Sequence, residues 1–242
     1  MKLKLLTYNL FFDKAIADAR RVMEEEQPDI LCVQELLTDY KALTRLEKKP
    51  WKLAGWSNSF VNFWNIYGIA TYINTEKWRV LGGRDDSLPS STYDLWIWLT
   101  RGMHMSRRYM QIRIQHRKSK HEVVVYNTHL THLSFADFRL AQLRTIFNDM
   151  EKASSRHTPV LICGDFNLYN GKTELEAMLL QYKLKEATTN LAYTFTRHWW
   201  FGELKMKLDY ILYRNLEVLE TRRLPHYSSD HHPVVSEFKL GS

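Results

Sequence analysis

The chain has 242 residues, 45% of them hydrophobic and 25% charged, and its 34 basic residues against 27 acidic ones give a net charge of +7. This composition excludes wholesale disorder, and two cysteines are too few for a disulfide framework, so Cys32 and Cys163 are predicted to be buried and reduced. No stretch approaches the roughly 18 uninterrupted apolar residues of a membrane span. We expect a soluble, cytoplasmic, monomeric protein with no implied protein partner, and its charge favours anionic partners such as nucleic acid.

The first part of the chain predicts a strand, a helix and a second strand. Residues 3–10 form the first strand, and Asp13 is expected to cap a helix that ends before Pro28. Residues 29–34 form a short apolar run that is typical of a buried strand. A strand, a helix and a strand within about 35 residues indicate a βαβ unit.

Strands outnumber helices in the rest of the chain. Alternating or apolar runs predict strands at residues 66–73, 77–81, 93–99, 108–115, 122–128, 159–163, 208–212 and 233–238. Helical spacing predicts helices at residues 135–152 and 172–180. No linker or repeat divides the chain, so residues 1–240 are predicted to form a single α/β domain, a two-sheet β-sandwich flanked by helices.

Polar side chains stand in six short clusters at the ends of predicted strands. The clusters are Tyr8-Asn9, Gln34-Glu35, Asn127–His129, Gly164–Asn167, Lys207–Tyr210 and Ser228–His231. A polar side chain beside a buried strand must be hydrogen-bonded or take part in chemistry, because burying it unpaired is costly. Six such clusters together predict one polar pocket at one edge of the packed sheets.

The side chains in these clusters suit a hard metal ion. They are four carboxylates, two amides and two imidazoles: Glu35, Asp165, Asp209, Asp230, Asn9, Asn167, His129 and His231. Carboxylate and amide oxygens favour Mg²⁺, with Mn²⁺ as a substitute, and such a cation beside histidine donors is what phosphoester hydrolysis requires. The sequence has no serine-hydrolase elbow, P-loop or zinc-site spacing.

Six sequence blocks, TYNL, VQE, NTHL, ICGDFN, LDYIL and SDHHPV, occur in this order between residues 7 and 235. Together they resemble the signature blocks of the endonuclease/exonuclease/phosphatase superfamily, the DNase I-like metal-dependent phosphoesterases. The resemblance covers nearly the whole chain, and the ordered set is far more specific than any single block. It implies a DNase I-like four-layer sandwich and the hydrolysis of a phosphate ester.

The resemblance also implies a metal site and a site for the attacking water. Glu35 is the expected principal metal ligand, with Asn9 and Asp230 nearby. Asp165 is expected to hold the attacking water, and Asn167 is expected to contact the phosphate. The alternative for these residues is an ordinary turn, cap or surface position, since Asp and Asn favour turns.

Two histidines are implied as donors to the phosphoryl group. His231 is expected to be oriented by Asp209, and a carboxylate beside an imidazole raises the pKa of the imidazole and keeps it cationic near neutral pH. His129 is the second expected donor, with a satisfied core histidine as the alternative. His132 and His232 are expected to lie outside the group that contacts the phosphate.

Two further segments are candidates for contacting the substrate. The stretch 101–120 holds seven basic residues and no acidic one, which is typical of a phosphate-backbone track or of a solvated hairpin. Arg107 or Arg108 in this stretch is placed to reach the substrate phosphate. Residues 196–201 put Arg197 and Trp199 just before LDYIL, where they would stack on bases or close the edge of the core.

Three classes of function remain open. The positive charge favours a Mg²⁺-dependent DNA nuclease or DNA-end-processing phosphodiesterase. The second class is a phosphatase or phosphodiesterase for small-molecule or lipid-headgroup phosphates. The third is a binding protein on an inactive nuclease fold, which the filled catalytic positions disfavour. Phe11 stands where AP endonucleases carry an aspartate. The Thr-His-Leu sequence of the NTHL block resembles the corresponding block of DNase I and of phosphodiesterases that act on DNA ends.

Overall fold

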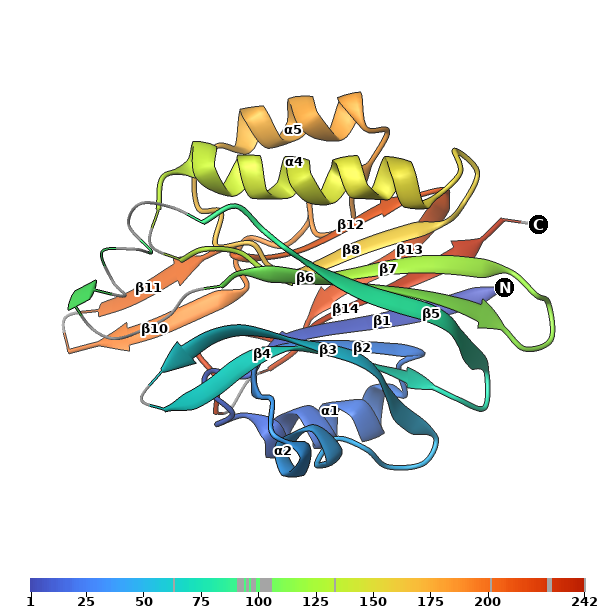
Figure 1. Ribbon diagram of the computed structural model, residues 1–242, viewed down its shortest axis with the longest axis horizontal. Helices are drawn as coiled ribbons and strands as arrows, with labels where there is room; N and C mark the ends of the chain where they lie inside the picture. Colours follow the sequence, from blue (N-terminus) through green and yellow to red (C-terminus); the bar gives the residue numbers. More distant parts are fainter. Residues whose placement is uncertain are drawn as a thin grey trace.

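In the described part of the chain, two six-stranded β-sheets pack face to face, and helices cover both outer faces of the sandwich (Figure 1). The computed structural model describes the chain except residues 63, 91–93, 95, 97–98, 101–105, 133, 201, 226–227 and 242. The layers run from helices to a sheet, a second sheet and further helices (Figure 1). The predicted α/β sandwich with flanking helices is confirmed.

The strands of each sheet come from distant parts of the chain. The first sheet has the order β13 (Leu216–Arg223), β14 (Val234–Leu240), β1 (Lys2–Asn9), β2 (Ile30–Leu37), β4 (Asn65–Asn74) and β3 (Trp51–Asn62). The second sheet has the order β5 (Trp78–Ser87), β6 (Arg108–His116), β7 (Glu122–His129), β8 (Val160–Asp165), β12 (Asp209–Arg214) and β9 (Lys185–Glu186).

Helices and one hairpin complete the described fold. Helices α1 (Ile16–Glu26) and α2 (Tyr40–Thr44) cover the first sheet, and α4 (Ala136–Ala153) and α5 (Lys172–Gln181) cover the second (Figure 1). Strands β10 (Phe195–Trp199) and β11 (Gly202–Met206) form a separate hairpin that projects from one side of the sandwich (Figure 1). None of the described helices is both long and apolar enough to cross a membrane.

The central strands are apolar on both faces because each face is covered. Successive side chains alternate across a strand, so Cys32 of β2 faces the inter-sheet core while Leu31 faces the layer under α1. Cys163 of β8 likewise belongs to the inter-sheet core, and Ile162 belongs to the layer under α4. Both cysteines are free and buried, as predicted.

Each sheet has a parallel pair of strands near its centre. β1 and β2 run parallel, as the βαβ pattern predicts, and β7 and β8 run parallel in the second sheet. The other paired strands in the two sheets are antiparallel. The four parallel strands end at the same edge of the sandwich, where the polar clusters of the sequence come together.

Most predicted elements are found within a few residues of their expected bounds, but the predicted helix cap is wrong. Helix α1 begins at Ile16, after Ala15, and no side chain caps it. Asp13 lies in a left-handed conformation with φ of 68° and pairs with Arg45 at 2.7 Å. The Asp13 carboxylate therefore forms an ion pair with Arg45, in the segment after α2. It does not accept a hydrogen bond from the N–H groups at the start of the helix.

The predicted strand at residues 93–99 is also wrong where it can be compared. Residues 93, 95, 97 and 98 lie outside the described part, and Asp94, Trp96 and Leu99 are helical. Thr100 Oγ1 donates to the Trp96 carbonyl at 2.7 Å, which is a bond across one helical turn. Strand β3 was not predicted, because two register shifts interrupt its alternation of polar and apolar residues.

Candidate active site

The ends of the parallel strands bring the predicted site residues together. Asn9 ends β1, His129 ends β7 and Asp165 ends β8. Glu35 lies near the end of β2. Asp209 begins β12 and is directly opposite Asp165 in the antiparallel pairing of β12 with β8. The strand order thus turns separate sequence clusters into one site.

The loop before β14 carries His231 and is tied to the end of β1. Ser229 Oγ donates to the Asn9 carbonyl at 2.8 Å and accepts from the backbone N–H of His231 at 3.0 Å. Phe195 of β10 forms an isolated backbone bridge with His231 and packs edge-on against its ring at a centroid distance of 5.1 Å. The β10–β11 hairpin is therefore anchored directly beside this histidine.

A β-bulge in β2 aims Glu35 into the site. The pairing of β2 with β4 shifts register between Gln34 and Leu36, and Glu35 has a φ of 56°. In a regular strand Gln34 and Glu35 would point to opposite faces, whereas the extra residue of a bulge re-aims a side chain. The backbone N–H of Phe12 donates to Glu35 Oε2 at 3.1 Å and holds the carboxylate in place.

Asp165 lies at the centre of the site. Its Oδ2 accepts from Asn9 Nδ2 at 2.9 Å and lies 3.5 Å from His129 Nε2 and 3.6 Å from His231 Nε2. Its Oδ1 accepts from the backbone N–H of Asn167 at 2.9 Å. Burial raises the pKa of Asp165, and this outweighs the lowering effect of the nearby His231 charge. A carboxylate with a raised pKa is a better acceptor for a proton from water.

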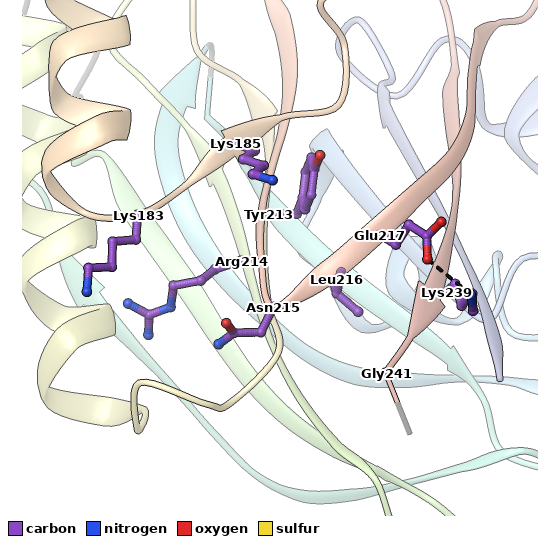
Figure 2. Close-up of a pocket in the computed structure, with 9 residues that line it drawn as sticks. All are labelled: Lys183, Lys185, Tyr213, Arg214, Asn215, Leu216, Glu217, Lys239 and Gly241. Carbon is purple, nitrogen blue, oxygen red and sulfur yellow. Dashed lines mark ion pairs between the residues drawn. The ribbon is translucent and has the colours of Figure 1, made fainter.

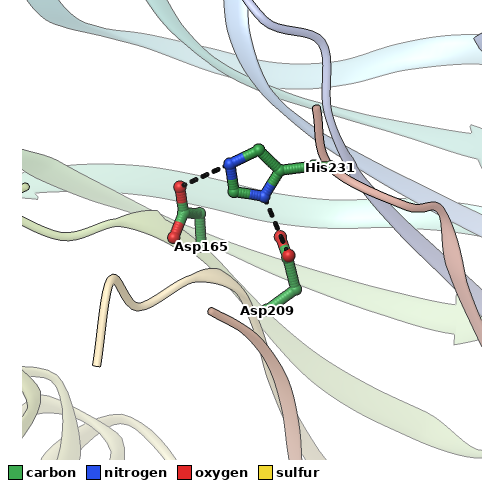
Figure 3. A group of neighbouring side chains, drawn as sticks. All are labelled: Asp165, Asp209 and His231. Atoms are coloured by element: carbon green, nitrogen blue, oxygen red, sulfur yellow. Dashed lines mark hydrogen bonds and ion pairs between the residues drawn. The ribbon is translucent and has the colours of Figure 1, made fainter. Parts of the chain in front are cut away.

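Figure 3 shows His231 between two carboxylates. Its Nδ1 donates to Asp209 Oδ2 at 2.9 Å, and its Nε2 faces Asp165. Burial by itself lowers the pKa of His231, but the charges of Asp209 and Asp165 outweigh burial and raise that pKa to about 10. His231 is therefore a cation at neutral pH, with a proton on each ring nitrogen.

His129 has the opposite surroundings. Arg107 Nη1 donates to His129 Nδ1 at 3.0 Å, and a guanidinium has no acceptor, so Nδ1 must present its lone pair. Burial and the positive charges of Arg107 and His231 lower the pKa of His129 well below its ordinary value. The neutral ring therefore carries its proton on Nε2, which lies 3.7 Å from Glu35 Oε1.

His132, expected outside the group around the phosphate, contacts a predicted site residue. Its Nδ1 lies 3.1 Å from Asn167 Oδ1, and Asn167 Nδ2 donates to the Leu130 carbonyl at 3.1 Å. Arg139 of α4 is fully buried and donates to the carbonyls of Thr131 and His132 at 2.9 and 2.7 Å. The sequence signal for Arg139 is its position: it is a charged residue on the face of α4 that also carries Leu143 and Ile146, which are apolar and buried.

A buried amide pair joins the two sheets behind the site and was not predicted. Gln34 Nε2 donates to Asn127 Oδ1 at 2.8 Å and to Thr7 Oγ1 at 3.2 Å. Gln34 precedes Glu35 on β2, and Asn127 lies two residues before His129 on β7. The pair therefore holds these two site residues at a set spacing across the sheets.

The buried carboxylate oxygens of the site suit a divalent cation. Asn9 Nδ2 bridges the carboxylates of Glu35 and Asp165 at 3.3 and 2.9 Å, and burial raises the pKa of Glu35. Asp230 Oδ1 is buried with no hydrogen-bond partner among the described residues. Such carboxylate oxygens are the ligands that Mg²⁺ and Mn²⁺ prefer. Asn9 presents N–H groups here, since its Oδ1 accepts from the Phe11 N–H at 3.0 Å.

A second group with metal-ligand atoms is the one drawn in Figure 3. Asp165, Asp209 and His231 offer ligand atoms within 4.8 Å of one another. To bind a metal, His231 would have to lose a proton, and its pKa of about 10 opposes that loss at neutral pH. The protonated His231 ring therefore favours hydrogen bonding to the two carboxylates in this group.

The predicted substrate-binding residues lie in two places. Arg107 is buried beside His129, whereas Arg108 Nε donates to Asp85 at 2.7 Å at the sheet edge. Arg197 and Trp199 lie on β10, with the guanidinium of Arg197 at 5.5 Å from the Trp199 ring centroid. Arg107 is thus engaged with a histidine of the candidate site, and the other three residues flank the site.

The basic stretch 101–120 does not form one track beside the site. Strand β6 leaves the site at Arg108 and reaches His116 at the opposite edge, and its nine residues span about 30 Å. Arg117 and Lys120 follow in the hairpin at that far edge. Arg101 lies outside the described residues.

The cavity of about 500 Å³ shown in Figure 2 is distant from these residues. It lies where β12 ends at Arg214, whereas the site lies where β12 begins at Asp209. Two of its basic residues are paired, Lys239 with Glu217 at 3.2 Å and Arg214 with Glu151. It is therefore no part of the candidate active site.

Comparison with known families agrees with this geometry. The model of the Endonuclease/Exonuclease/phosphatase family matches residues 6–231. The chain belongs to this family. Its members are metal-dependent hydrolytic phosphoesterases, so the predicted family and the predicted class of enzyme are confirmed. No curated protein matches the sequence.

Solved structures of family members share the fold at low sequence identity. An endonuclease/exonuclease/phosphatase from Bacteroides vulgatus is similar with a TM-score of 0.79 and 16% identity over 100% of both chains. TDP2 of D. rerio, complexed with a single-strand DNA product, is similar with a TM-score of 0.74 and 14% identity over 99% of both chains. A mannosyl-6-phosphatase of Bacteroides thetaiotaomicron has a TM-score of 0.73 and 16% identity, covering 98% of this chain and 100% of its own.

Proposed function

We propose that this chain is a Mg²⁺-dependent phosphodiesterase that acts on nucleic acid, with DNA strands and DNA ends as the first substrates to test. The observation that carries the proposal is the position of Asp165 between a neutral and a cationic histidine, 3.5 Å from His129 and 3.6 Å from His231. A carboxylate that can accept a proton, flanked by two fixed donors, suits the attack of water on a phosphoryl group.

Each of these side chains has one task in the proposed reaction. Asp165 orients the attacking water and accepts its proton at a carboxylate oxygen. His231 donates its Nε2–H to one phosphoryl oxygen while its Nδ1–H stays bonded to Asp209. His129 donates its Nε2–H to another oxygen, and Asn167 contacts the phosphate. Donors held in advance need no reorganisation when negative charge develops.

The divalent cation would be held beside the Glu35 carboxylate, whose Oε1 lies 3.7 Å from His129 Nε2. Glu35 is the proposed principal ligand, with Asp230 as the second, and the Asn9 amide orients the carboxylates. When bound, Mg²⁺ or Mn²⁺ supplies positive charge that polarises the phosphoryl oxygens. Two buried carboxylates with raised pKa values, Glu35 and Asp165, are the physical reason that a cation is favoured here.

The β10–β11 hairpin supports nucleic acid as the class of substrate. It is anchored to His231 through Phe195, and its tip carries Trp199 and Trp200, which are 49% and 94% exposed. Exposed aromatic rings beside a cation such as Arg197 stack on bases with little regard to sequence. The similar fold of TDP2, which was complexed with a single-strand DNA product, supports the same class.

A second candidate is a phosphatase or phosphodiesterase for small-molecule or lipid-headgroup phosphates. It is favoured by the course of β6, which leads most of the basic stretch away from the site. The similar fold of a mannosyl-6-phosphatase supports it as well.

One experiment separates the two candidates. Plasmid, single-stranded and abasic DNA are incubated with the protein and Mg²⁺ or Mn²⁺ beside a panel of phosphate esters, with Glu35→Gln as the matched variant. We expect DNA degradation that stops on chelation, and Glu35→Gln should need more Mg²⁺ for the same rate. Binding should weaken steeply with salt, since several phosphate contacts release counterions. Hydrolysis of small phosphates alone would support the second candidate and reject the first.

A further inference from the structure

Three consecutive residues after β1 have a left-handed backbone conformation. Phe11, Phe12 and Asp13 have φ values of 47°, 54° and 68°. A residue with a Cβ atom rarely adopts this conformation, and a run of three such residues is strained. Backbone strain persists only where the surrounding structure holds it, and it gathers at functional sites. The segment 11–13 is therefore a candidate for a function beyond the connection of β1 to α1.

Hydrogen bonds to the site residues hold this segment in place. The N–H of Phe11 donates to Asn9 Oδ1 at 3.0 Å, and the N–H of Phe12 donates to Glu35 Oε2 at 3.1 Å. The N–H of Asp13 donates to the Glu35 carbonyl at 3.0 Å. The segment thus wraps around Glu35 and fixes the positions of the two phenylalanines.

A series of ring contacts joins these phenylalanines to His129. The ring centroids of Phe11 and Phe12 are 5.6 Å apart, and those of Phe12 and Phe60 are 5.9 Å apart. Phe60 lies edge-on to His129 at a centroid distance of 6.0 Å. Phe60 is buried, whereas Phe11 and Phe12 are half-buried. The outer end of this aromatic cluster is therefore in contact with water close to Glu35.

A cation lies against the outermost ring of the cluster. Lys14 Nζ is 4.0 Å from the centroid of the Phe11 ring. Lys14 is exposed and forms no ion pair with any residue that the structure describes. A partly exposed ring beside a cation is typical of surfaces that bind unpaired nucleotides, because the ring contacts the base and the cation contacts the backbone phosphates.

We infer that Phe11 is a specificity-determining residue, which contacts the sugar and base of a nucleotide bound through its phosphate at the candidate active site. The inference rests on the proposed function. Two half-buried rings offer enough surface for one sugar and base, and Lys14 is placed for the phosphate of a neighbouring nucleotide. The contact favours nucleotides over phosphates that carry only a small alkyl group.

The test uses two phosphonates, whose carbon–phosphorus bond resists hydrolysis. One is the analogue of thymidine 5′-monophosphate in which a methylene group replaces the bridging oxygen. The other is ethylphosphonate, which ends in the same way but has no sugar or base. Titration calorimetry with Mg²⁺ measures the Kd of each ligand, and the ratio of the two Kd values reports contact with the sugar and base. We expect wild-type protein to bind the thymidine analogue at least about tenfold more tightly.

Two substitutions remove the Phe11 ring in different ways, and each should lower this preference by about fivefold or more. Glycine adopts a φ of 47° freely, so Phe11→Gly should keep a melting temperature close to that of wild type. Phe11→Leu keeps an apolar side chain against Phe12. Trp56→Ala is the matched control, because Trp56 is 41% exposed and pairs with Ala70, a residue of the layer under α1. The control should keep the wild-type preference.

The outcomes separate this inference from the proposed function. If wild-type protein binds both phosphonates equally, or if folded Phe11→Gly and Phe11→Leu keep the wild-type preference, the role of Phe11 is rejected and the proposed function stands. If neither variant folds, Phe11 is part of the core and its role is rejected as well. If folded wild-type protein binds neither phosphonate with Mg²⁺ or Mn²⁺, the proposed function fails and the inference fails with it.

Discussion

His129 and His231 approach the same oxygen of Asp165, yet their surroundings give them opposite charges. Burial does not distinguish them, since they are 2% and 6% exposed. The partner at Nδ1 does: a guanidinium from Arg107 keeps His129 neutral, and a carboxylate from Asp209 keeps His231 cationic. The charge of the hydrogen-bond partner therefore decides the state of a buried imidazole.

The difference gives the site two donors that do not compete for a proton. The neutral ring is fixed as the Nε2–H tautomer by its partner, and the cationic ring keeps its Nε2 proton across neutral pH. Both donors can face one phosphoryl group at once, which suits a reaction that develops negative charge on several oxygens.

The largest expected effect comes from removing the group that both histidines face. Asp165→Asn keeps the shape of the side chain but cannot accept a proton, so kcat should fall by about 10³–10⁴-fold while the melting temperature changes little. Steady-state kinetics at saturating Mg²⁺ and a thermal melt of the same preparation measure both quantities. A rate close to that of wild type would exclude Asp165 as the base.

Asp209→Asn should remove one of the two carboxylate charges that keep His231 cationic and lower kcat by about 10²–10³-fold. The pKa of His231 is about 10 in the folded protein, so activity that needs the cation is lost as pH rises through that value. With one carboxylate gone this pKa falls, and the alkaline limit of the kcat–pH profile should move to lower pH. A profile with an unmoved alkaline limit would show that Asp209 does not control His231.

The same raised pKa makes a prediction about stability. The pKa of His231 is higher when folded than when unfolded, so its ion pairs stabilise the fold fully below the ordinary histidine pKa of about 6.5. That stabilisation is lost as pH rises towards about 10. Denaturant titrations of wild type and Asp209→Asn across this range should therefore converge at the alkaline end. Parallel curves would contradict the assignment.

A smaller effect is expected at His129. Arg107→Met removes the donor to Nδ1 and a nearby positive charge, so the pKa of His129 should rise and both neutral tautomers should become populated. We expect a loss of about tenfold in kcat, and ¹⁵N NMR of the imidazole should show the tautomer change. Arg107→Lys keeps a cationic donor and should restore part of both readouts. Imidazole shifts that match wild type in Arg107→Met would rule out this role.

The smallest effect is expected at His232, the neighbour of His231 in sequence. Its Nε2 lies 3.0 Å from Thr196 Oγ1 and its Nδ1 lies 3.2 Å from the Leu224 carbonyl, so it supports the loop. His232→Gln should cost about 1 kcal/mol of unfolding free energy and leave kcat within about twofold of wild type. A large loss of turnover at unchanged stability would bring His232 into the catalytic group.

Local patterns were enough to predict the strands that build the site and the polar residues at their ends. Apolar runs and alternation are properties of neighbouring residues, so β1, β2, β7 and β8 could be read directly, and their terminal residues followed. The pairing of Asp209 with His231, implied by the ordered sequence blocks, is present at 2.9 Å. Strand β3 was not predicted, because its bulges break the alternation of polar and apolar residues on which such a prediction depends.

The charge state of His129 and the positions of the predicted substrate-contacting residues were decided by the tertiary structure alone. Arg107 meets His129 across 22 residues of sequence because β6 pairs with β7, and no local pattern records that pairing. The bulge that turns Glu35 inward is set by the partner strand β4. The basic stretch looked continuous in sequence, but an extended strand carries its two ends to opposite edges of the sheet. Sequence determined which groups are available, and long-range strand pairing determined which of them meet.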